Sequence, residues 1–175
     1  MFWYILGQII GGIGVLLFFV SYFCKTQKKL LFIQILGNAI MVVHFFLIGA
    51  KTGYFLLIAA TIRNIILYFG DKKYLSRKGI PYILAVIIAG IGALSWEGYY
   101  SLFIIIGLGI NTVFLSVKNV NLLKASVILT SSLILTYDVF AFSISGIINE
   151  GMAIIGSILG LITYYVCNKK QIKEN

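Results

Sequence analysis

The chain has 175 residues, of which 61% are hydrophobic and 11% are charged, and its mean hydropathy is +1.03. A soluble domain is about 45–50% apolar and about 25% charged, so this chain lacks the polar residues that cover a water-exposed globule. The composition therefore excludes an ordinary soluble domain and a disordered chain. The net charge of +9 does not indicate nucleic-acid binding, because most basic residues stand between long apolar runs. We predict an all-α, polytopic membrane protein.

Seven apolar segments predict transmembrane helices, which need about 20 residues each. Charged residues or turns that contain glycine separate them. In chain order the predicted helices are 3–24, 30–50, 54–70, 79–95, 99–117, 122–144 and 147–168. The boundary between the last two has the weakest signal, a Ser145-Gly146 turn. No basic segment precedes the first apolar run and no small-residue cleavage site follows it, so we expect a retained helix rather than a signal peptide.

The basic residues indicate how these helices are oriented. Cytoplasmic segments of membrane proteins are enriched in Lys and Arg. With the N-terminus outside, 12 of the 14 basic residues fall in the predicted cytoplasmic segments, Lys51 falls outside, and Arg63 lies within the third helix. A missed or extra helix would destroy this asymmetry. We therefore predict seven spans, an outer N-terminus and a cytoplasmic C-terminus.

A shift of 93 residues superimposes the two halves of the chain. The matched pairs are Gly14 and Gly107, Val20 and Val113, Lys25 and Lys118, Leu30 and Leu123, Ile35 and Ile128, Gly53 and Gly146, and Ala60 and Ala153. Each copy holds three helices and one helix separates the copies, so both copies have the same orientation in the membrane. We predict three units: a first repeat at 1–70, a linker with the fourth helix at 71–96, and a second repeat with a short cytoplasmic tail at 97–175.

Three short motifs stand at the end of the second predicted helix, in the third and at the start of the seventh. They are Val43-His44-Phe45-Phe46-Leu47-Ile48-Gly49, Ala60-Thr61-Ile62-Arg63-Asn64 and Asn149-Glu150-Gly151. With these motifs the chain resembles the YgjV-type bacterial inner-membrane proteins. Its helix pattern is similar to that of the SWEET, SemiSWEET and PQ-loop proteins, whose sugar transporters are built from two parallel triple-helix bundles. The resemblance implies this fold and a membrane location more firmly than it implies a substrate.

The chain departs from SWEET-like proteins in the first helix of each repeat. Those proteins carry a proline there that acts in their rocking motion. Helices 3–24 and 99–117 contain no proline but several glycines, which allow close helix packing or bending. Close packing is the simpler interpretation, so a proline-hinged mechanism is not expected, whereas alternating access remains open.

Charged side chains within the spans are the strongest functional candidates, because a charge at the bilayer centre costs roughly 2.5–3.5 kcal/mol on insertion scales. Arg63 lies near the middle of the third helix, and Asp138 lies in the outer half of the sixth. The two residues are predicted either to form a structural ion pair or to face a solute together. Arg63 would favour an anionic or polyhydroxyl solute.

The remaining candidates are uncharged polar residues near mid-depth. His44 is the only histidine, so we expect no metal cluster. It either takes part in proton coupling or bonds to a neighbouring helix as a neutral ring. In SWEET-like proteins an asparagine on the third helix of each repeat contacts substrate, and Asn64 is the residue here that matches. Asn38 and Asn111 would complete a central polar site or serve to hold helices together.

Two functions follow from these predictions. The first is a small-solute transporter or facilitator that uses alternating access, with a substrate site formed by Arg63, Asn64, Asn38, His44, Asn111 and Asp138. The alternative is a non-transporting membrane protein, either lipid-binding or an assembly partner, whose buried polar residues are structural. We expect membrane lipids as partners, no nucleic acid, no cofactor and no enzymatic activity, and a homo-oligomer is left open. A polar cavity that reaches Arg63 would distinguish the two.

Overall fold

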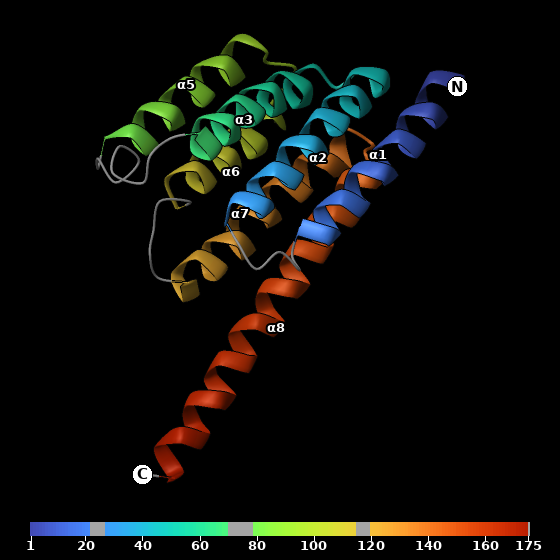
Figure 1. The fold of residues 1–175 in the computed structure, drawn as a ribbon. Helices are drawn as coiled ribbons and strands as arrows, with labels where there is room; N and C mark the ends of the chain where they lie inside the picture. Colours follow the sequence, from blue (N-terminus) through green and yellow to red (C-terminus); the bar gives the residue numbers. More distant parts are fainter. Residues whose placement is uncertain (22–26, 70–78, 115–119, 175) are drawn as a thin grey trace.

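The structure, a computed structural model, describes residues 1–21, 27–69, 79–114 and 120–174. These residues form seven α-helices and no strand, which confirms the all-α fold (Figure 1). The helices are α1 (Phe2–Ser21), α2 (Gln27–Ile48), α3 (Lys51–Phe69), α5 (Ile80–Leu94), α6 (Ser101–Phe114), α7 (Val120–Phe140) and α8 (Ile144–Glu174). Five of them are long and apolar enough to cross a membrane, whereas α5 and α6 are shorter apolar helices of 15 and 14 residues.

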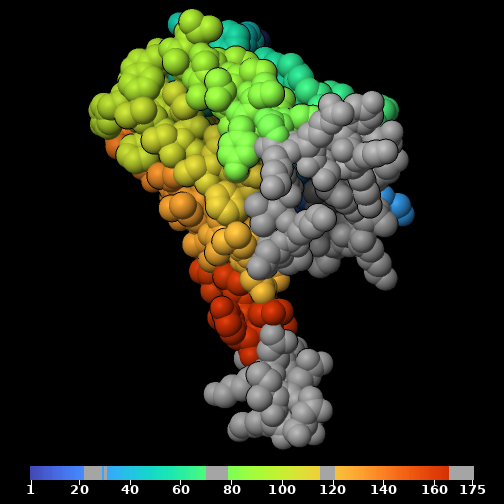
Figure 2. All heavy atoms as spheres, turned by 90° about the vertical axis from the view of Figure 1, so that its left-hand side faces the viewer, coloured from blue at the N-terminus to red at the C-terminus, as the bar shows by residue number. Residues whose placement is uncertain are grey.

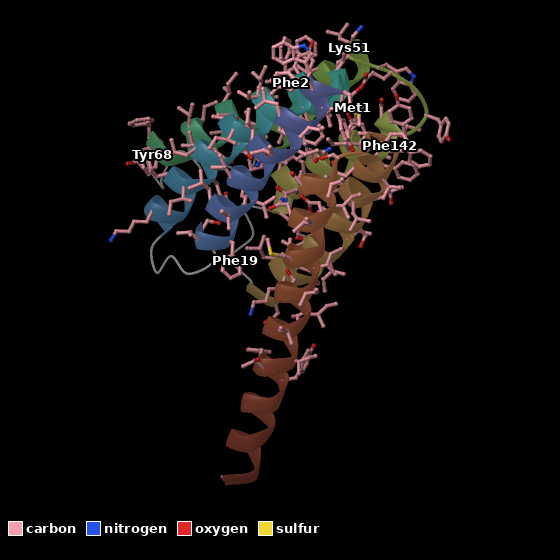
Figure 3. All side chains as sticks on the ribbon, turned by 90° about the vertical axis from the view of Figure 1, so that its right-hand side faces the viewer. Met1, Phe2, Phe19, Lys51, Tyr68 and Phe142 are labelled. Carbon is pink, nitrogen blue, oxygen red and sulfur yellow. The ribbon has the colours of Figure 1, made fainter. Side chains whose placement is uncertain are left out.

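Six helices pack in a closed order, α1–α2–α3–α6–α7–α8, with α8 returning to α1. Helix α5 packs against the outside of α3 and α6. The C-terminal part of α8 extends beyond the other helices (Figures 1 and 2). Figure 3 places Phe2, Lys51 and Phe142 at one end of the bundle, so the starts of α1, α3 and α8 lie together. We refer to this end as the outer end, after the topology predicted from the basic residues.

The ends of the helices recur at the 93-residue interval. Helices α3 and α8 begin at Lys51 and Ile144, which are 93 residues apart. The left-handed backbone positions follow the same interval, because Gly49 has φ +83° and Phe142 has φ +53°. The internal symmetry therefore extends from the sequence to the backbone of the turns. The three unit boundaries at 1–70, 71–96 and 97–175 stay a prediction.

Two predicted turns lie a few residues away from the observed ones. The predicted boundary at Ser145-Gly146 is wrong, because α7 ends at Phe140 and α8 already begins at Ile144. Likewise α3 begins at Lys51, which we assigned to the preceding turn. Phe142 takes the left-handed conformation that glycine usually provides, while Gly146 lies inside α8, where it permits a close helix contact.

The core lies where the two halves meet. Leu56 and Tyr137 are fully buried, and Ile88 and Ile104 are 2% exposed. By contrast, many large apolar side chains are exposed on the outside of the bundle. A soluble protein rarely exposes so much contiguous apolar surface, whereas a membrane protein places such a surface against lipid. Aromatic rings from α2, α7 and the segment before α6 pack together at the outer end, with Tyr137 in contact with both Phe45 and Tyr100.

Candidate functional site

Arg63 lies at the contact between α3 of the first half and α6 of the second. It is 6% exposed, and within the described residues its guanidinium donates to uncharged groups. Nη1 donates to Oγ1 of Thr112 at 2.8 Å and to Oδ1 of Asn111 at 3.3 Å, and Nε donates to Oδ1 of Asn64 at 3.2 Å. The site therefore brings together three of the six predicted residues, and we refer to Arg63, Asn64, Asn111 and Thr112 as the arginine site.

The predicted alternative of an Arg63–Asp138 ion pair is wrong. In the described part of the chain Arg63 bonds to α6, and Asp138 packs against Gly146 of α8. Depth separates the two residues. Arg63 is 12 residues into α3, about 18 Å from its outer end, whereas Asp138 is two residues, about 3 Å, from the outer end of α7. Sequence position alone did not show this separation, because the outer end of α7 was predicted four residues too late.

The arginine site has an excess of positive charge. Amide and hydroxyl oxygens satisfy guanidinium hydrogen atoms, but they do not neutralise the charge. Among the described residues Arg63 has no carboxylate partner. A buried cation of this kind is retained at a cost, and it favours an anion or a group rich in hydroxyl oxygens.

Thr112 was not among the predicted residues, although it makes the shortest bond to Arg63. Its hydroxyl also donates to the carbonyl of Leu108 at 2.7 Å and is therefore free to accept from the guanidinium. A threonine next to Asn111 in an otherwise apolar helix was a usable signal, because the two side chains lie at the same depth. Asn38 is buried on α2 but is not a hydrogen-bond partner of Arg63.

His44 lies in a second polar centre at the outer end of the bundle. Its ring is fully buried. Nδ1 lies 2.8 Å from the carbonyl oxygen of Gly7 in α1, and Nε2 lies 2.8 Å from Oγ of Ser143. Ser143 precedes the first residue of α8, and its Oγ accepts from the backbone N–H of Gly146 at 3.0 Å, which is an N-cap bond. His44 thus connects α1, α2 and the start of α8.

The hydrogen bonds of His44 define its tautomer. A carbonyl oxygen only accepts, so Nδ1 carries a hydrogen atom, and the Ser143 hydroxyl can donate to Nε2. The network is complete with a neutral ring. Because His44 is the only histidine, ¹⁵N-histidine NMR of the tag-free protein reports on it alone. We expect a protonated Nδ1 and an unprotonated Nε2, and the opposite tautomer would contradict this geometry.

The same outer end carries matched bonds in the two halves. Oγ1 of Thr52 lies 3.0 Å from Oγ of Ser101, and Oγ of Ser145 donates to the carbonyl of Gln8 at 2.9 Å. Thr52 and Ser145 are 93 residues apart, and so are Gln8 and Ser101. These bonds join α3 to α6 and α8 to α1, two helix pairs at which the halves pack against each other. The outer end is therefore bridged on both sides of the internal symmetry.

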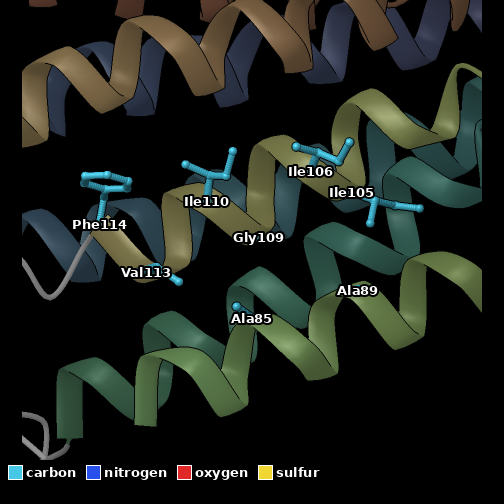
Figure 4. A pocket seen from close by; sticks show the side chains of 8 residues that line it. All are labelled: Ala85, Ala89, Ile105, Ile106, Gly109, Ile110, Val113 and Phe114. Carbon is cyan, nitrogen blue, oxygen red and sulfur yellow. The ribbon is translucent and has the colours of Figure 1, made fainter. Parts of the chain in front are cut away.

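One groove among the described residues is apolar and lies between α5 and α6 (Figure 4). Its volume is about 390 Å³. Its lining residues are Ala85, Ala89, Ile105, Ile106, Gly109, Ile110, Val113 and Phe114. Arg63 is not among them, so this groove is distinct from the arginine site.

Comparison with known proteins gives one family. The sequence model of the family Imp-YgjV, described as bacterial inner membrane protein, matches residues 5–168. No curated protein and no solved structure matches the chain. The matched residues include most of each described helix and both polar centres.

Proposed function

Because this chain belongs to the Imp-YgjV family of bacterial inner membrane proteins, we propose that it is a transporter or facilitator of a small solute in that membrane. The solute is anionic or rich in hydroxyl groups. The observation that supports this most directly is Arg63, a buried cation with uncharged partners at the contact between the two halves. A residue that served only to join α3 and α6 would not need a charge.

The internal symmetry supports alternating access for this proposal. Two similar halves that meet at α3–α6 and at α1–α8 can rock against each other around a site between them. The outer end is bridged by the Thr52–Ser101 and Ser145–Gln8 bonds. With the N-terminus outside, Arg63 lies toward the cytoplasmic end of α3. A solute would then reach Arg63 from the cytoplasm in this conformation, as in the rocking of SWEET-like bundles.

Thermal stabilisation by ligands tests the arginine site. A ligand that binds the folded state at 100 times its Kd stabilises it by about 2.7 kcal/mol. We expect the purified protein to be stabilised by a member of a panel of sugars, nucleosides and small organic anions. The stabilisation should persist in Lys51→Gln, which removes an exposed cation at the start of the same helix, and disappear in Arg63→Gln.

The Thr112→Val variant gives an independent measurement if Arg63→Gln does not fold. It removes the 2.8 Å hydrogen bond but leaves the charge in place, so it should weaken the response to the ligand without abolishing it. A ligand that stabilises Arg63→Gln as well as the parent protein would contradict the proposed site. A panel without any stabilising member would favour a non-transporting role.

One observation favours the non-transporting alternative. The α5–α6 groove is lined by eight apolar residues and lies among helices of a membrane protein, where it suits a lipid chain. In that case the polar centres would only join helices. Flux of the stabilising ligand into proteoliposomes separates the two functions, because a lipid-binding protein would show none.

A further inference from the structure

Two acidic side chains lie within the membrane-spanning part of the second half. The chain has five acidic residues, and of these Asp138 lies on α7 and Glu150 on α8. Both belong to the contact between α7 and α8, because the Asp138 carboxyl group packs on Gly146 of α8 and Glu150 lies about one helical turn further along that helix. Such an arrangement is unfavourable unless a cation or a proton joins it.

Asp138 occupies a tightly enclosed position. It is 1% exposed, and its Oδ1 has no hydrogen-bond partner in the described structure. The carboxyl group packs directly on Gly146, where an added Cβ would lie 2.5–2.6 Å from Cγ and both carboxyl oxygens. Only glycine fits there, so the carboxyl group lies directly against the backbone of α8.

The equivalent position in the first half holds an apolar ring. Phe45 is the symmetry mate of Asp138, and it packs on Gly53 as Asp138 packs on Gly146. An added Cβ at Gly53 would lie 2.8 Å from the Phe45 ring. The same local geometry therefore accepts an uncharged group in one half and holds a carboxyl group in the other.

Two further positions are polar in the second half and apolar in the first. Asn149 and Glu150 correspond to Leu56 and Leu57 of the first half. Nδ2 of Asn149 donates to Oε1 of Glu150 at 3.0 Å, whereas Oδ1 of Asn149 is buried without a partner. Ser131 of α7 also interacts with the Glu150 carboxyl group. The α7–α8 contact thus holds more acceptor oxygens than donors. The equivalent positions of the first half hold leucine and phenylalanine, so the fold does not require polar side chains there.

The other titratable groups around Asp138 do not supply a positive charge. From α2, the imidazole of His44 bonds to Ser143 and Gly7 rather than to the carboxyl group. Tyr137 precedes Asp138 on α7, and Tyr100 and Glu97 act on Tyr137 from the segment before α6. From the far end of α7, Lys124 donates to the carbonyl of Gly160 at 3.1 Å.

We propose that Asp138 and Glu150 form a proton-binding site between α7 and α8, with Asn149 as an additional acceptor. The proton binds to a carboxyl oxygen of Asp138, which is 1% exposed and has an oxygen without a partner in the described structure. It removes one of the two negative charges and needs no space beyond that of the side chains. In a transporter this site would couple solute movement to the proton gradient of the inner membrane, a consequence that rests on the proposed function. The binding of the proton itself does not depend on it.

Infrared spectroscopy tests this site without any solute. The carbonyl stretch of a protonated carboxylic acid is separate from the bands of a carboxylate, and it shifts in D₂O. The variant Asp71→Asn/Glu97→Gln/Glu174→Gln removes every acidic side chain except Asp138 and Glu150. In a detergent without ester or acid groups, we expect this variant to show the carboxylic acid band at neutral pH. Adding Asp138→Asn should abolish the band, and adding Glu150→Gln should shift it.

Two results would overturn the proposal. One is the absence of a carboxylic acid band at neutral pH, both from the spectrum of the triple variant and from the difference spectrum between the parent protein and Asp138→Asn. If the triple variant does not fold, the difference spectrum alone gives the answer. The other is stabilisation by Na⁺ but not by K⁺ that disappears in Asp138→Asn, which would make the site one for a metal ion. Neither result depends on whether Arg63 binds a solute.

Discussion

Replacing Gly11 with alanine should destabilise the protein by about 1–3 kcal/mol, the usual cost of overpacking a core. An added Cβ would lie 2.6 Å from Oγ of Ser145 and 2.7 Å from Nδ1 of His44. Neither neighbour can move freely, because Ser145 bonds to Gln8 and His44 bonds to Gly7. The methyl group would therefore push α1 away from both α2 and α8. Thermal or SDS unfolding in detergent measures the effect.

Gly12 provides the matched control for this variant. It is the next residue on the same helix, and an added Cβ there meets no atom within 4 Å. Alanine in a helix interior is favoured over glycine by roughly 0.5–1 kcal/mol, so Gly12→Ala should leave stability unchanged or raise it. If the two variants had equal stability, the close contact of α1 with α2 and α8 would be refuted.

Removal of the His44 ring should have the largest effect on stability among single substitutions in the outer polar centre. The side chain is fully buried and connects Gly7 of α1 with Ser143 at the start of α8. His44→Ala leaves a cavity and an unpaired Ser143 hydroxyl, which together cost roughly 3–5 kcal/mol. We expect a large fall in the apparent melting temperature.

Two variants control for the loss of size and of polarity. His44→Gln keeps a donor and an acceptor and should recover part of the lost stability. Phe46→Ala removes a larger side chain from the same helix, but Phe46 is 64% exposed on the outside of the bundle, so its loss should cost much less. Equal losses in His44→Ala and Phe46→Ala would show that the hydrogen bonds of His44 contribute nothing.

Arg63 and Asp138 show which features of the two residues can be predicted from the sequence and which cannot. Periodicity and charge showed that both residues lie inside helices, because a long apolar run with one charge has few alternatives. Whether they form an ion pair stayed open, because the answer needed the position of the outer end of α7 to within one turn. That end is set by Phe142, a residue whose left-handed backbone no composition rule predicts. A shift of one helical turn is sufficient to change which side chains meet.

The three asparagines likewise separate what the sequence predicts from what only packing decides. Asn64 and Asn111 were selected as polar residues near mid-depth, and the structure brings both to Arg63. Asn38 was selected by the same criterion, yet it is not a partner of Arg63. Depth follows from counting residues, whereas the rotation of each helix follows from packing against neighbours. The polar partner with the shortest bond, Thr112, depends on that rotation.

The sequence by itself determined the class, the helices and the internal symmetry of this protein. An apolar run of about 20 residues has no stable alternative to a helix in a bilayer, because every backbone polar group must be satisfied within the segment. The 93-residue interval was likewise visible as matched residues, and it recurs in the helix ends. Local chemistry decides these features, so they can be read without knowledge of the neighbours.

Only the tertiary structure decided which polar groups meet across the helices. It placed Arg63 among uncharged partners, seated the Asp138 carboxyl group on Gly146, and linked His44 to Gly7 through Nδ1. The bond from Arg63 to Thr112 joins residues 49 positions apart, and the bond between His44 and Gly7 joins residues 37 positions apart. Such contacts depend on the rotation and depth of packed helices. Hydropathy cannot specify either one, because an apolar residue has the same hydropathy whether it faces lipid or the core.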